Sequence, residues 1–107
     1  MITINLYNST NPKKKYMIKF LNPDTNRWNT LHFGAKYYSD YTIHKSNDRK
    51  NNYIKRHSGM GEDWSKTGLY TPGFWSRWLL WEKPSIDNAI KNIEKKFKIK
   101  IIHHDSV

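Results

Sequence analysis

Apolar and polar positions alternate at the start of the chain, and this alternation predicts a first strand. Ile2, Ile4 and Leu6 alternate with polar neighbours, which is the period of a half-buried strand. The same period returns over residues 16–20 and 28–33, and turn-forming residues separate the three runs. Because the connections are short, we expect an antiparallel meander with one buried face.

The stretch 73–81, with the sequence GFWSRWLLW, is nearly apolar all round. Thr71 and Pro72 precede it as a cap and a first helical residue, so the pattern predicts a short helix. Each aromatic side chain buries roughly 150–250 Å², and we therefore expect this helix at the centre of the core. A partner surface or a platform for stacking bases is the alternative interpretation.

Residues 45–57 predict a helix with two different faces, capped by Ser46 or Asn47. At about 100° per residue, one face is cationic and the other packs against the core. A row of long donors on a rigid element suits a phosphate backbone, although many such rows are only solvated. The expected outer row is Lys45, Arg49, Asn52 and Arg56, and the expected packing side is Tyr53, Ile54 and His57.

The rest of the chain completes the expected fold. Ser85 caps a helix over residues 86–97, residues 99–102 suit a fourth strand, and 103–107 look like a flexible tail. We predict a single α+β domain over residues 1–107, in which three helices cover the meander.

Residues 35–44 show no helical period, and we expect an ordered crossing loop there. Its three tyrosines, Tyr37, Tyr38 and Tyr41, either cover the open face of the sheet or stack on bases. Cover is the favoured interpretation.

The net charge of the chain indicates nucleic acid as a possible partner. Nineteen Lys and Arg against nine Asp and Glu give +10 and a pI near 9.8, a balance that attracts polyphosphates. A genome rich in A and T could produce the same bias. The chain has no cysteine and no apolar run of membrane-spanning length or signal-peptide pattern, so we expect a soluble protein that is not secreted by that route.

Basic residues outside the predicted cationic helix could also meet phosphates. A lysine run at a hairpin loop is often only solvated, and Arg77 could instead pair with Glu62, Asp63 or Glu82. The expected nucleic-acid contacts are Lys13, Lys14, Lys15, Lys45, Arg49, Lys50, Lys55, Arg56 and Arg77.

Several runs resemble a family of small uncharacterised proteins encoded mainly by giant viruses, the nucleocytoplasmic large DNA viruses. The runs are SDYTIHK from Ser39, RK at Arg49, YI at Tyr53, RH at Arg56, and the Trp-rich stretch. The resemblance covers roughly residues 33–97. It implies a viral protein in the virion or in the infected cell, at a viral factory in the cytoplasm, and it carries over no functional residues.

The favoured function is non-enzymatic, sequence-tolerant binding of nucleic acid, with double-stranded DNA as the expected partner, in genome packaging or as a virion component. The alternative is a structural protein that binds other capsid or core proteins through aromatic surface. A nuclease is less favoured. It would use His44 with Asp40, or His57 with Arg56 and Glu62 or Asp63. We expect no catalytic residue, metal or cofactor, and the pattern does not indicate an oligomeric state.

Overall fold

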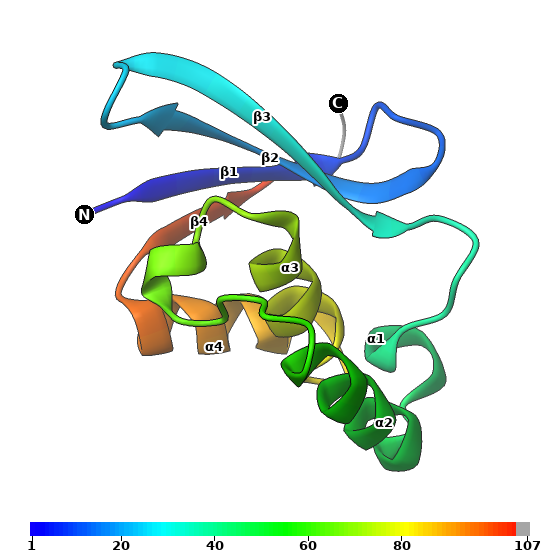
Figure 1. Cartoon of the computed structure of the whole chain (residues 1–107). Helices are drawn as coiled ribbons and strands as arrows, with labels where there is room; N and C mark the ends of the chain where they lie inside the picture. The colour runs from blue at the N-terminus through cyan, green and yellow to red at the C-terminus, as the bar shows by residue number, and fades with distance from the viewer. Residues whose placement is uncertain (105–107) are drawn as a thin grey trace.

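A four-stranded sheet forms one side of the molecule (Figure 1). The computed structural model describes residues 1–104. Its strands lie in the order β3-β2-β1-β4. The first three pair antiparallel, while β4 runs parallel to β1, because the chain crosses one face of the sheet before it returns. The predicted α+β fold with an N-terminal meander is confirmed. The strands are β1 (Thr3–Asn8), β2 (Lys14–Asn22), β3 (Arg27–Ala35) and β4 (Lys100–His103).

The helices all lie on one side of the sheet (Figure 1). The predicted caps are confirmed, since the hydroxyls of Ser46, Thr71 and Ser85 each accept from the backbone N–H three residues later. The helical elements are α1 (Tyr41–His44), α2 (Asn47–Ser58), the 3₁₀ turn η1 (Lys66–Gly68), α3 (Pro72–Trp75), the π-helical segment η2 (Ser76–Leu80) and α4 (Ile86–Phe97).

The Trp-rich stretch is the centre of the core, as predicted. Phe74 and Trp75 are completely buried. The Trp75 ring lies 6.1 Å from that of Phe33 on the sheet, and its Nε1 donates to the Leu69 carbonyl at 2.7 Å. Phe74 packs against Phe97 of α4. This stretch therefore joins the sheet to α4.

Residues 72–80 are helical, as predicted, but they do not form one regular α-helix. The backbone is α-helical only to Trp75 and widens into the π-helical segment η2. The ring of Trp81, which follows, stacks on Tyr53 of α2 at 4.3 Å and 3° between planes. Helix α2 thus packs on the end of the Trp-rich segment, and not over the sheet as we expected. This places α2 at the side of the molecule (Figure 1).

The crossing loop is shorter than predicted. Residues 41–44 form α1, because the buried Asp40 accepts from the Thr42 backbone N–H at 2.9 Å and caps this turn. Tyr37 and Tyr38 are 85% and 75% exposed, so they do not cover the sheet. Only Tyr41 is buried.

The chain is also ordered further than expected at its end. His103 belongs to β4. The His104 backbone N–H donates to the Leu6 carbonyl at 2.8 Å, and its ring stacks on Tyr7 at 4.3 Å. These two residues are thus not part of a flexible tail, and the remainder of that prediction, 105–107, lies outside the described residues.

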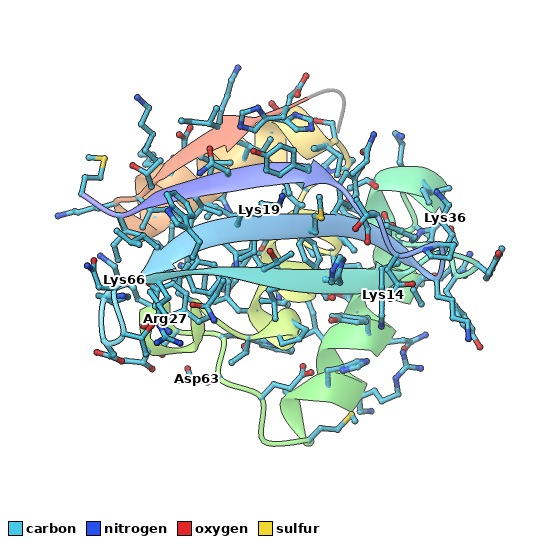
Figure 2. The ribbon with its side chains drawn as sticks, turned by 90° about the horizontal axis from the view of Figure 1, so that it is seen from above. Lys14, Lys19, Arg27, Lys36, Asp63 and Lys66 are labelled. Carbon is cyan, nitrogen blue, oxygen red and sulfur yellow. The ribbon has the colours of Figure 1, made fainter. Side chains whose placement is uncertain are left out.

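The face of the sheet away from the helices is open. Figure 2 views the molecule from this side, and Lys19 stands in the middle of the sheet. The buried residues Ile4, Leu6 and Ile18 point to the other face, toward the helices.

Candidate functional site

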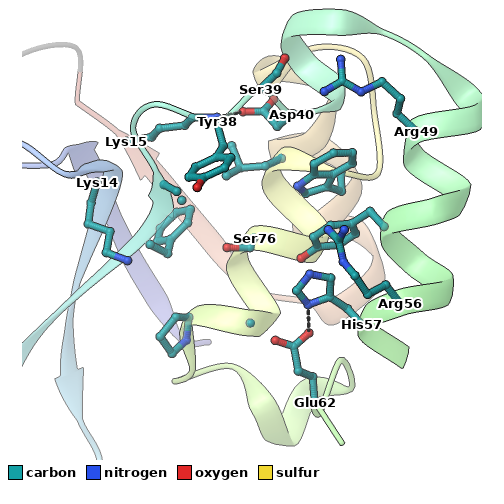
Figure 3. Close-up of a pocket in the computed structure, with 18 residues that line it drawn as sticks. Lys14, Lys15, Tyr38, Ser39, Asp40, Arg49, Arg56, His57, Glu62 and Ser76 are labelled. Carbon is teal, nitrogen blue, oxygen red and sulfur yellow. Dashed lines mark hydrogen bonds and ion pairs between the residues drawn. The ribbon is translucent and has the colours of Figure 1, made fainter. Parts of the chain in front are cut away.

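A cleft of about 500 Å³ lies between the end of the β2–β3 pair and helix α2 (Figure 3). Lys14 lines one wall, and Arg49 and Arg56 line the other. The π-helical segment lies between the walls and contributes Ser76 and Leu80. Residues of β2, β3 and α2, which are distant in the sequence, therefore line the same cleft.

Two glycines allow the walls to approach. Gly34 has φ +78°, and a Cβ there would lie 2.8 Å from Cδ1 of Leu80, so β3 comes directly against the π-helical segment. A Cβ on Gly73 would lie 2.7 Å from Oε1 of Glu62. A side chain at either position would displace a residue that lines the cleft.

One carboxylate in the cleft is held by a lysine, and the other lies beside a histidine. Nζ of Lys15 lies 2.5 Å from Oδ2 of Asp40, and Nδ1 of His57 lies 3.4 Å from Oε2 of Glu62. Within residues 1–104, neither carboxylate is within ion-pair distance of a lysine or arginine other than Lys15.

Three cations of the cleft remain uncompensated. Lys14, Arg49 and Arg56 form no ion pair with any carboxylate in residues 1–104. Lys14 is half-buried, and both arginines are exposed on α2. The cleft is therefore electropositive, and its donors are free to meet an anion.

The inner wall of α2 is apolar. Burial, and after it the Glu62 carboxylate, raises the pKa of the Tyr53 phenol, so this group stays neutral. Its ring packs between Trp81 and His57. This stack sets the position of the helix that carries the two arginines.

His44 lies near the Lys15–Asp40 end of the cleft, close enough for both charges to act on its imidazole. Its Nδ1 accepts from the Ser46 backbone N–H at 2.9 Å. Desolvation, followed by repulsion from Arg49, lowers the pKa of its imidazole. Nδ1 is thus occupied by its hydrogen bond with Ser46, Nε2 is buried, and His44 does not line the cleft, so neither nitrogen is placed there as a general base.

Three of the residues predicted to contact nucleic acid are instead paired with carboxylates of the protein. Lys15 is paired with Asp40, as described above. Nζ of Lys50 contacts Glu82 Oε1 at 3.1 Å, and Nη2 of Arg77 contacts Glu82 Oε2 at 3.3 Å. Arg77 is only 8% exposed and its guanidinium lies over the Trp78 ring at 4.4 Å. The Glu82 carboxylate thus binds Lys50 of α2 and Arg77 of the Trp-rich segment, and it joins these two elements.

Three other predicted residues lie outside the cleft. Lys13 is exposed in the β1–β2 loop, and Lys55 is exposed on α2 without lining the cleft. Lys45 has φ +56° and ends α1, where its Nζ donates to the Thr42 carbonyl at 3.1 Å. It therefore precedes α2 and does not extend the row of arginines as we expected.

The sequence offered Glu62 and Asp63 as possible neighbours of His57, and only one of them lies beside it. Glu62 is its neighbour, whereas Asp63 bonds Ser65 and Thr67 in its own loop. Those hydrogen bonds, from Ser65 first, lower the pKa of Asp63. No group of three His, Asp or Glu in residues 1–104 is placed to hold a metal ion.

The fold and the site define a small α+β protein with an electropositive cleft. A family model described as a family of unknown function (DUF5754) matches residues 4–57, which is half of the chain, and the chain belongs to this family. The match includes Lys14, Arg49 and Arg56. No curated protein and no solved structure matches the chain. Within the described part of the chain, no helix has the length and apolar character needed to cross a membrane.

Proposed function

We propose that this protein binds nucleic acid through its phosphates at the cleft, without reading the base sequence. The observation that carries the proposal is the uncompensated set formed by Lys14, Arg49 and Arg56 on two facing walls. Arg can hold two phosphate oxygens at once, and each neutralised phosphate releases counterions. Contacts of this kind position a protein on a polymer but do not select a sequence.

Duplex DNA is the first ligand of this proposal, since its backbone can lie along the mouth of the cleft where Arg49 and Arg56 are exposed. The net charge of +10 favours the encounter. The proposal concerns binding and not cleavage. Its setting is a giant-virus infection, where the protein would help package or handle the genome in the virion or viral factory.

A second candidate is a structural protein that contacts capsid or core proteins. The exposed rings of Tyr37 and Tyr38 favour it, because they project from the loop beside the cleft. Large exposed aromatic side chains are common anchors of protein interfaces.

Paired charge reversals separate the two candidates. Arg49→Glu with Arg56→Glu changes the cleft, while Lys45→Glu with Lys55→Glu changes the net charge equally outside it. Fluorescence anisotropy with a labelled duplex should show affinity lower by roughly tenfold or more for the cleft variant than for the control. Equal losses would mean that net charge alone attracts DNA. A structural protein would show no duplex binding before or after either change.

A further inference from the structure

The open face of the sheet has a regular polar composition. The strand register places Lys19 between Asn5 and Thr30, in a row that ends with Ile102 on β4. No Asp or Glu occurs in any of the four strands. The cations on this face are Lys19 at its centre, which Figure 2 shows, and Lys100 on the β4 edge, both exposed. The face therefore attracts anions.

Trp28 on β3 is the exposed tryptophan of the chain. Its side chain lies on this same face, opposite Leu21, and is 68% exposed. The other four tryptophans are buried or half-buried. The ring of Tyr7, by contrast, is already occupied by His104, stacked at 4.3 Å, and by Lys19 Nζ at 5.3 Å. Trp28 is thus the aromatic surface on this face with room for a further ring.

A single exposed ring alone indicates little. Here it shares with Lys19 and Lys100 a face whose strands carry no carboxylate, and that combination defines one ligand chemistry. An aromatic surface stacks on a planar base, while lysines neutralise the adjoining phosphates. In a duplex the base faces are stacked on one another, so only an unpaired strand can offer one to Trp28.

We propose that this open face binds single-stranded nucleic acid, with one base stacked on Trp28 and the backbone passing over Lys19. The exposed apolar side chains do not extend across the whole face. Trp28 and Leu21 lie at one corner, where they line a shallow hollow with Met1, and Ile102 lies on the β4 edge at the end of the row of Asn5, Lys19 and Thr30. The inference goes beyond the proposed function, because the cleft is lined by α2 and the π-helical segment, and these lie on the other side of the sheet (Figure 1).

Tryptophan fluorescence with an oligothymidylate of about 12 nucleotides tests the inference. Stacking should quench the emission of Trp28, and Trp28→Ala should remove this quenching. Binding by Trp28→Ala should weaken by roughly 5- to 150-fold, whereas Trp28→Phe, which keeps a ring, should retain most of the affinity. Because the side chain is exposed, circular dichroism should show the same fold for all three proteins.

Three results would overturn the inference. One is oligonucleotide affinity unchanged in Trp28→Ala, and another is an equal loss for single-stranded and duplex DNA. The third is a concentration-dependent dimer, seen by sedimentation, that Trp28→Ala abolishes without affecting oligonucleotide binding, since the face would then join two copies of the chain. Failure of the cleft proposal is separable. A variant with Arg49→Gln and Arg56→Gln should still show the quenching at saturating oligothymidylate.

Discussion

Nζ of Lys15 lies 2.5 Å from Oδ2 of Asp40, and both side chains are largely buried. The other carboxylate oxygen of Asp40 accepts from Thr42 and caps α1. One side chain therefore joins strand β2 to the turn that leads into α2. The shape of the cleft depends on this ion pair, because the pair fixes the position of the β2 wall relative to the α2 wall.

We predict that Asp40→Ala destabilises the protein by about 3–5 kcal/mol. The change leaves the charge of Lys15 buried and unpaired and removes the cap of α1. Urea denaturation followed by circular dichroism measures the loss. Asp24→Ala, in the exposed β2–β3 turn, is the matched control and should change the free energy of unfolding by less than about 0.5 kcal/mol. Similar losses for the two variants would contradict the structural role of Asp40.

Gly34 and Gly61 offer a matched pair for the packing of β3 against the π-helical segment. Both have positive φ, at +78° and +75°, but a Cβ on Gly61 would meet nothing within 4 Å. Gly61→Ala should therefore cost only the left-handed backbone strain, about 1–2 kcal/mol. Gly34→Ala adds the 2.8 Å approach to Leu80 and should cost a further 1–3 kcal/mol or so. Equal thermal-denaturation shifts in the two variants would contradict this contact.

The free energy of unfolding should fall as the solution becomes acidic, partly through His44. Its folded-state pKa is lower than the ordinary value of 6.5, so the unfolded chain binds the proton more readily. The contribution of His44 to the free energy of unfolding is therefore fully present above pH 6.5. It is lost as the pH falls from there through the folded-state pKa.

Denaturation at pH 7.5 and 5.5 measures this loss for the protein and for His44→Asn. The asparagine carbonyl oxygen can accept from Ser46 but does not titrate. The variant should lose less stability on acidification. Equal pH dependence in both proteins would show that His44 does not contribute.

Local patterns predicted most of the secondary structure. Alternation located the strands, and the hydroxyls of Ser46, Thr71 and Ser85 marked where helices begin. Both patterns involve only residues that are close in the chain, so they can be recognised without knowing any tertiary contact. No local pattern predicts that the helix widens after Trp75. The position of Trp81, which follows the widened segment and stacks on Tyr53 of α2, could therefore not be predicted either.

The candidate site could be predicted only in part, because it depends on contacts between distant residues. Charge and helical spacing identified Arg49 and Arg56, but they could not show that Lys14 faces them across a cleft. The sequence offered Glu82 as one of three possible partners of Arg77, and the structure confirms it, but nothing indicated that Lys50 shares the same carboxylate. The positive φ of Gly34 was likewise hidden, although a glycine that ends an alternating run is a signal for close approach.

The salt dependence of duplex binding tests the central claim most directly. The logarithm of the affinity should fall linearly with the logarithm of the salt concentration, with a slope of about −0.9 per neutralised phosphate. Replacing Arg49 and Arg56 by Gln should reduce the magnitude of this slope by roughly 2, while Lys45→Gln with Lys55→Gln should leave it nearly unchanged. A slope that is the same in the arginine variant and in the unaltered protein would contradict phosphate binding in the cleft.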